Sequence, residues 1–313
     1  MSLDRANISG GPAKVTWNSA TFFSRNPIAV RHEPAWDDVL VDAHGNINKV
    51  ETDRVITIPM RLWGAWENLS VLFPSAVLTP SIGALPGIFS TTDLPLVILG
   101  KNGDQITYHN AQITKLSNLF LGVGETIFAA DVEFTALIKN NVNPEDAAAY
   151  YTIATGQAYA DTTFALTNFA RMRFSAAWGA VAGFTAFQAK EGWNIEWELG
   201  LEPVKVDALG TVSMTIQKFS AKATCIPIQH TLPQLETASK SQLNALGRLL
   251  STGSADLVIT GAASPTPVIT LKNAMISGHG HNWGQNLFRT GPTTWETTVG
   301  FTTGTAAARA VIA

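Results

Sequence analysis

Cysteine and charge are both scarce in this chain of 313 residues. Because Cys225 is its only cysteine, the chain has no internal disulfide framework, which is typical of proteins from a reducing compartment. Charged residues make up 14% of the sequence, against roughly 25% in ordinary soluble domains. We therefore expect partners to cover much of the surface; an unusually large core is the alternative.

Three further features are missing. No cluster of about five to eight Lys or Arg residues occurs, and the formal net charge is −3. Both features disfavour direct binding of nucleic acid through a basic patch. No run of about 18 apolar residues occurs, so we expect no membrane span. The opening MSLDRANISGGPAK lacks an apolar core, so we expect no secretory signal and a soluble protein that folds in the cytoplasm.

Motifs for chemistry are also lacking. The sequence contains no glycine-rich phosphate loop in a strand–helix context, no GxSxG and no HExxH. His279 and His281 could both bind one metal ion, but no third and fourth ligands are evident nearby. The flanking Gly278 and Gly280 favour a structural loop. We expect no enzyme activity, no cofactor and no metal.

The two halves of the sequence resemble each other. Five pairs of segments recur in the same order, about 165 residues apart, with small drifts that loop insertions would produce. The pairs are VDAHG (41–45) and VDALG (206–210), TIPM (57–60) and CIPI (225–228), LVILG (96–100) and LVITG (257–261), ITYHNAQIT (106–114) and ITLKNAMIS (269–277), and segments starting at Gly124 and Gly291 that match Phe128 with Trp295. These matches predict a tandem duplication.

The predicted domains are 8–139 and 171–304, joined by a connector at 140–170 and followed by a tail at 305–313. Alternating and β-branched segments predict a mainly β fold, a sandwich or barrel in each copy. One flanking helix per copy is expected, at 63–74 and 239–253, because apolar residues recur there at helical spacing. The connector could begin a short helix at Pro144 that runs through Tyr151, and its aromatic residues indicate that it lies along a domain or a neighbour.

Expected strands follow from β-branched and aromatic runs bounded by turn residues. In the first copy they are 14–23, 28–42, 47–61, 94–99, 104–116 and 125–138; in the second they are 171–178, 190–206, 210–228, 256–260, 267–277 and 292–303.

Several segments resemble a known family. They are GGPAKVTWNSATFFS, WGAWENLSVLFP and LVILGKNGDQITYHNAQITKLSNLFLGVGETIFAADVEFTALIKNN in the first half, and VKVDALGTVSMTIQ and LVITGAASPTPVITLKNAMIS in the second. With these segments the chain resembles the major tail tube proteins of siphophages, in the form that fuses two tube domains. The similarity is one of pattern, diffuse, and covers nearly the whole chain.

The resemblance implies a structural virion protein without catalysis. It implies β-sandwich domains, about six around each ring, and therefore a homotrimeric ring with pseudo-sixfold symmetry. Stacked rings would form a tail tube that conducts DNA without binding it specifically. The implied partners are further copies of the chain and the tape measure, terminator and baseplate components. The implied location is the virion, after assembly in the host cytoplasm.

The segment 191–203 shows the clearest alternation. Trp193, Ile195, Trp197, Leu199 and Leu201 would share one strand face, and Glu196, Glu198 and Glu202 the other. We expect these carboxylates to face the lumen, because a wall that passes DNA should not hold phosphate. An ordinary solvated face is the alternative, since the matching face of the first copy, with Arg31, Glu33 and Asp37, repeats the acidic character only in part.

The first copy carries an apolar insertion at 74–95 that the second lacks. We expect its apolar residues to contact an adjacent ring, with a surface loop over its own domain as the alternative; they are Leu78, Ile82, Leu85, Ile88 and Phe89.

Two other functions remain open. One is a different tail ring, such as a distal tail, terminator or baseplate protein. The other is a glycan-binding β-sandwich or hydrolase, for which Glu196 and Glu198 would be the paired carboxylates.

Overall fold

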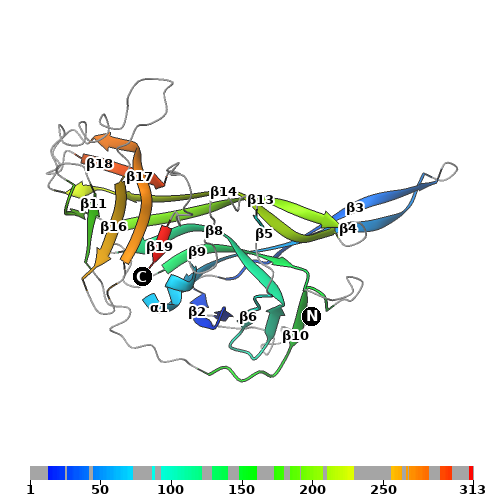
Figure 1. Cartoon of the computed structure of the whole chain (residues 1–313). Coiled ribbons are helices and arrows are strands. Elements are labelled where there is room, and N and C mark those ends of the chain that lie inside the picture. The colour runs from blue at the N-terminus through cyan, green and yellow to red at the C-terminus, as the bar shows by residue number, and fades with distance from the viewer. Residues whose placement is uncertain are drawn as a thin grey trace.

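The computed structural model is built almost entirely of antiparallel strands, which confirms the mainly β fold (Figure 1). It describes residues 13–24, 27–41, 45–72, 87–88, 93–121, 129–139, 148–160, 173–179, 184–190, 192–206, 210–228, 255–262, 266, 268–281, 290–297 and 310–312.

The described residues of the first half form ten strands and one short helix. The strands are β1 (Lys14–Trp17), β2 (Ala20–Ser24), β3 (Arg31–Val41), β4 (Gly45–Trp63), β5 (Gly87–Ile88), β6 (Leu96–Leu99), β7 (Gln105–Tyr108), β8 (Asn110–Leu121), β9 (Ala129–Leu137) and β10 (Tyr151–Ala154). The helix α1 (Trp66–Leu69) continues as a 3-10 turn over Ser70–Leu72.

The described strands of the second half follow a similar order. They are β11 (Phe174–Trp178), β12 (Phe187–Ala189), β13 (Trp193–Val206), β14 (Gly210–Cys225), β15 (Pro227–Ile228), β16 (Ala255–Gly261), β17 (Val268–His281), β18 (Thr290–Thr297) and β19 (Ala310–Ile312).

One long antiparallel sheet runs through both halves. Its neighbouring strands are β3, β4, β9, β8, β13, β14, β18 and β17, in that order. The halves meet where β8 pairs with β13. In Figure 1 the hairpin β3–β4 projects at one end of the molecule, and β17 and β18 lie at the other.

Two shorter sets of strands pack on this sheet. In the first half β2, β1, β6, β7 and β10 pair in that order, and in the second half β12, β11, β16, β17 and β19 do the same. Buried side chains from most of these strands form one continuous hydrophobic cluster. Burial of this apolar surface is the main stabilising term of the fold.

The two halves share details of packing as well as order. The indole N–H of Trp17 donates to the carbonyl of Ala111 at 2.8 Å, and that of Trp178 donates to Ala274 at 3.0 Å. Trp17 stacks edge-on against Phe134, and Trp178 against Trp295. Each Trp therefore fills the core of its half and satisfies its polar atom in the same way.

The hairpins β3–β4 and β13–β14 have the same register. Both contain two β-bulges: those after Ala35 and Val39 match those after Gly200 and Val204. Because a bulge fixes register and twist, the two hairpins bend alike.

The strand pairing corrects the alignment of the last segment in each half. Phe134 pairs with Ile58 as Trp295 pairs with Ala223, so Phe134, and not Phe128, stands in the place of Trp295. The matched spacing of turn residues was misleading there, because 21 positions separate Ile113 from its partner Phe134 and 19 separate Ile276 from its partner Trp295.

Two predicted elements of the first half are corrected. The run 14–23 is a hairpin, because Asn18 and Ser19 have φ angles of 45° and 64°, as in a two-residue type I′ turn. The helix predicted for 63–74 is reduced to α1 and its 3-10 turn, because Trp63 is still paired in β4 with Phe23 and Ala129. The helix predicted for 239–253 lies outside the described residues.

The connector contributes a strand. Residues 148–150 form a turn, and Tyr151, expected at the end of a helix, begins β10, which pairs with β7. The helix predicted through Tyr151 is therefore wrong at this residue, because pairing with an available sheet edge outweighs local propensity. Within the expected tail, β19 pairs with β17 in the same way as β10 pairs with β7.

Replacing Trp17 with Ala should lower the free energy of unfolding by about 3–5 kcal/mol, because it empties a fully buried core position and removes the indole donor to the carbonyl of Ala111. Denaturant unfolding of the unassembled protein measures this loss. The matched control is Trp36→Ala, since Trp36 is 51% exposed and its loss should change unfolding by less than about 0.5 kcal/mol. Equal effects of both substitutions would contradict this account of the core.

Candidate functional surface

Over its central strands the long sheet has one buried face and one polar face, whereas β3 and the tip of β4 are exposed on both faces. The alternation predicted for β13 is confirmed at its start: Trp193, Ile195, Trp197 and Leu199 are buried, whereas Glu196 is partly exposed and Glu198 exposed. Glu202 is exposed farther along, where β13 has passed the end of its pairing with β8. The residues directly opposite these glutamates on neighbouring strands extend the same polar face.

We define the polar face by the charged and amide residues that the ladder places side by side with Glu196 and Glu198. They are Arg61 on β4, Asp131 and Glu133 on β9, Lys115 and Asn118 on β8, Asn194 on β13, Lys222 on β14 and Glu296 on β18. Together with Glu196 and Glu198 the polar face holds five carboxylates and three cations, so these residues carry net negative charge.

A polar chain crosses the junction between the halves. Arg61 lies 3.6 Å from Asp131, which accepts a hydrogen bond from the Asn118 amide at 3.1 Å. The Asn194 amide then donates to Asn118 at 3.2 Å and to Glu196 at 2.8 Å. Because Asn118 belongs to the first half and Asn194 to the second, side chains reinforce the backbone pairing of β8 with β13.

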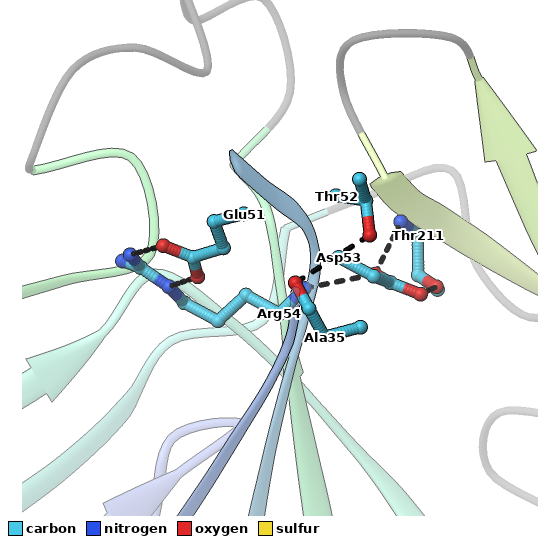
Figure 2. Close-up of polar contacts among 6 residues, drawn as sticks. All are labelled: Ala35, Glu51, Thr52, Asp53, Arg54 and Thr211. Atoms are coloured by element: carbon cyan, nitrogen blue, oxygen red, sulfur yellow. Dashed lines mark hydrogen bonds and ion pairs between the residues drawn. The ribbon is translucent and has the colours of Figure 1, made fainter. Parts of the chain in front are cut away.

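A second contact between the halves is centred on Asp53, which is 8% exposed. Its carboxylate accepts hydrogen bonds from the Thr211 backbone N–H at 2.8 Å and from the Thr211 hydroxyl at 2.9 Å (Figure 2). Lys205 Nζ lies 2.6 Å from the same carboxylate. The tip of the β13–β14 hairpin is therefore fixed to β4 of the first half.

Glycine permits this approach. Gly210 has a φ of 65°, and a Cβ there would lie 2.9 Å from Asp53 Oδ1 and 3.0 Å from the carbonyl oxygen of Thr52. Both the backbone conformation and the lack of space exclude a side chain.

Burial and hydrogen bonding shift the pKa of Asp53 in opposite directions. Burial raises the pKa of its carboxyl, but the hydrogen bonds from Lys205 and Thr211 outweigh burial, so the pKa lies below its ordinary value. The charged form is therefore the one that the fold stabilises.

A pocket of about 410 Å³ opens between the β13–β14 hairpin and the first half. It is lined by residues of β4, β8, β9, β13 and β14, among them Asp53, Lys115, Glu133, Glu198 and Lys205. Lys115 lies directly opposite both Glu133 and Glu198 in the strand ladder. This position between two carboxylates reduces their mutual repulsion.

The connector is held against the opposite side of β4. Arg54 donates two hydrogen bonds to Glu51, at 2.6 and 2.7 Å (Figure 2). Its guanidinium also lies over the ring of Tyr150, 5.4 Å from the centroid. The hydrogen bond from Arg54 lowers the pKa of Glu51, and the Tyr150 contact adds a cation–π interaction.

Of the apolar insertion at 74–95, the structure describes Gly87 and Ile88, which form β5, and residues 93–95, where the carbonyl of Leu94 accepts a hydrogen bond from the Ala111 N–H. Ile88 pairs with Thr215 and Gly87 with Ile216, so this piece lies on β14 of its own chain. The other expected contact residues, Leu78, Ile82, Leu85 and Phe89, lie outside the described residues.

The described ranges contain no group of three or more His, Cys, Asp or Glu side chains arranged to hold a metal ion. His279 lies in strand β17 and not in a loop, because its backbone pairs with Thr293 of β18. No helix among the described elements is long and apolar enough to cross a membrane.

Sequence reasoning missed the Asp53 contact. Asp53, Lys205 and Thr211 are ordinary surface residue types in sequence, and 158 positions separate Asp53 from Thr211. The repeated segments VDAHG and VDALG gave a partial signal, since the glycine that ends each of them stands at a hairpin tip. They did not indicate that the tip at Gly210 would contact Asp53.

Comparison with models of known protein families gives no match, and none of the curated proteins compared is similar to the chain.

Replacing Asp53 with Asn should lower the free energy of unfolding at pH 7 by about 1.5–3 kcal/mol, because a buried carboxylate loses charge-assisted hydrogen bonds. Since folding lowers the pKa of Asp53, its contribution is present above the ordinary aspartate pKa and is lost as pH falls through the folded value. The difference between wild type and variant should therefore shrink below about pH 4.

The control for this experiment is Asp38→Asn. Asp38 is half exposed and lies 3.6 Å from Lys49, so its loss should cost less than about 1 kcal/mol. A difference between wild type and the Asp53 variant that stays constant down to pH 2 would contradict the assigned role of the charge.

Proposed function

We propose that this protein is a structural subunit of a phage tail tube, which assembles into stacked rings around a channel for DNA. The observation that carries the proposal is the long sheet to which both halves contribute, with one face of its central strands buried and the other polar and acidic. The resemblance of the sequence to siphophage tail tube proteins supports the same function.

The repeated strand pairing supports a tandem duplication. The hairpins β3–β4 and β13–β14 share both bulges, and Trp17 and Trp178 make matching contacts. Two equivalent modules in one chain can occupy adjacent positions in a ring, so three chains would give a ring with pseudo-sixfold symmetry.

The dimensions of a closed sheet fit a DNA channel. Three copies of the long sheet would contribute about 24 strands, spaced about 4.8 Å apart and tilted by up to about 45°. The backbone-to-backbone diameter would be roughly 37–52 Å. Side chains that point inward narrow this channel, and the remaining bore still admits a duplex about 20 Å wide.

The polar face suits the inner wall of such a channel. The other face of the central strands is buried in the hydrophobic core, which leaves the polar face to line the lumen. Its excess of carboxylates repels phosphate, so DNA can slide without being held. The side chains of Asp131, Glu133, Glu196, Glu198 and Glu296 supply this charge.

The partners follow from this architecture. Copies of the chain form the ring and the stack, and the tape measure, terminator and baseplate proteins would contact the lumen and the ends of the tube. The protein would be assembled in the host cytoplasm, would act in the virion and would need no cofactor or catalysis.

Negative-stain microscopy of the purified protein should show rings or open tubes roughly 80–100 Å wide, because about six domains of ordinary size would surround the bore. Long tubes from this protein alone favour the tube subunit, and single closed rings favour another tail ring. A protein that stays monomeric in gel filtration and binds glycans would refute the proposal and support a glycan-binding module.

Replacing Glu198 with Lys should make assembled tubes retain duplex DNA. Each ring would gain one reversed charge per chain on the lumen wall, and several such charges along a bore act together on phosphate. The measurement is DNA that co-sediments with tubes assembled in its presence, resists nuclease and is released at high salt.

The matched control for charge reversal is Asp104→Lys. Asp104 is exposed and lies in the turn between β6 and β7, away from the polar face. It should leave DNA retention at the wild-type level. Equal retention by both variants would contradict the lumen position of Glu198.

A further inference from the structure

We propose that copies of this chain join through the same interface that joins its two halves, so that β17 of one copy pairs with β3 of the next. This inference rests on the proposed assembly into rings. It goes further in naming the two strands that meet and the register in which they pair.

The internal junction supplies the template. There β8 pairs with β13, with Leu116 opposite Trp197 and Lys115 opposite Glu198. The first half thus ends at β8, and the second begins at β13. Among the described strands of the long sheet, β17 is the last on one side and β3 the last on the other.

β17 occupies in its half the place that β8 occupies in the first. Ile113 pairs with Phe134 as Ile276 pairs with Trp295, and a bulge follows both isoleucines. After the bulge Lys115 corresponds to Gly278, and Leu116 to His279.

β3 occupies the place of β13 in the same way. Arg31 pairs with Thr57 as Glu196 pairs with Lys222, and the two bulges of each hairpin coincide. Trp197 therefore corresponds to His32, and Glu198 to Glu33. Applied to the template, these matches place His279 of one copy opposite His32 of the next, and Gly278 opposite Glu33.

Exposed apolar side chains support the same interface. Trp36 and Ile47 on the β3–β4 hairpin are 51% and 56% exposed. Their counterparts on the β13–β14 hairpin, Leu201 and Val212, pack against the hydrophobic core. Since the first half covers the β13–β14 hairpin, the second half of a preceding copy would cover Trp36 and Ile47.

The two edges are unlike each other, which decides the symmetry. An edge that pairs only with a different edge gives head-to-tail association, and head-to-tail association closes into a ring when the rotation per copy allows it. A symmetric dimer through two β3 edges would leave β17 unused. The partner that fits this surface is therefore a second copy of the chain in head-to-tail orientation.

Engineered cysteines test the register. In a Cys225→Ala background, His32→Cys with His279→Cys should give disulfide-linked chains under mild oxidation, because opposite Cα atoms in antiparallel pairs lie about 4.5–5.5 Å apart, within disulfide range. The linked species should form a ladder that ends at three chains for a trimeric ring. The control pair Pro34→Cys with His279→Cys, displaced by two residues on the same strand face, should link at least tenfold more slowly.

A charge exchange tests the same contact without cysteines. A Cβ at Gly278 would meet nothing within 4 Å, so Gly278→Glu is compatible with the fold. Facing Glu33 of the next copy, it should raise the protein concentration needed for half-assembly several-fold, and adding Glu33→Lys to the same chain should restore it. Gly278→Lys alone, which copies Lys115 of the internal junction, should lower that concentration.

The outcomes separate the two proposals. Tubes that form normally but link better through the displaced cysteine pair, or through neither pair, overturn the β17–β3 register and leave the proposed function intact. Gly278→Glu that assembles like wild type overturns it as well. A chain that stays monomeric at every concentration overturns the register and the proposed function together.

Discussion

The pairing of β8 with β13 is the contact on which the architecture depends. Each half buries its own tryptophan core, and without this pairing the halves would be two separate sandwiches, each with open strand edges. Such edges invite uncontrolled association. Joining them converts two modules into one continuous sheet and gives the polar face its length. The contact is reinforced at both ends, by Asn118 and Asn194 on the polar face and by Asp53 at the hairpin tip.

The junction also explains why the carboxylate of Asp53 is buried. Asp53 is desolvated by the hairpin that lands on it, and that same hairpin supplies Lys205 and Thr211 as partners. A carboxylate placed there without these partners would oppose folding. The requirement is mutual, because the tip can approach only where Gly210 leaves out a side chain. The buried charge of Asp53, the glycine at position 210 and the position of the hairpin tip therefore depend on one another.

The sequence predicted much of the fold and less of the site. Alternation identified the start of β13 and its buried face, because period-two burial is a local property. The turn at Asn18 and Ser19 was missed, since this pair lacks the usual glycine, and Trp63 was placed in a helix because its spacing suits either structure. The β8–β13 pairing and the Asp53 contact join residues far apart in sequence, and no local pattern specifies which distant edge a strand will choose.

The chain of side chains from Arg61 through Asp131, Asn118 and Asn194 to Glu196 has a mechanical consequence. These side chains link neighbouring strands across the junction, in addition to the backbone hydrogen bonds between β8 and β13. The two halves therefore resist hinging against each other. In a tube built of such subunits, curvature would have to be absorbed between successive rings. The wall of each ring would keep a constant bore while the filament flexes.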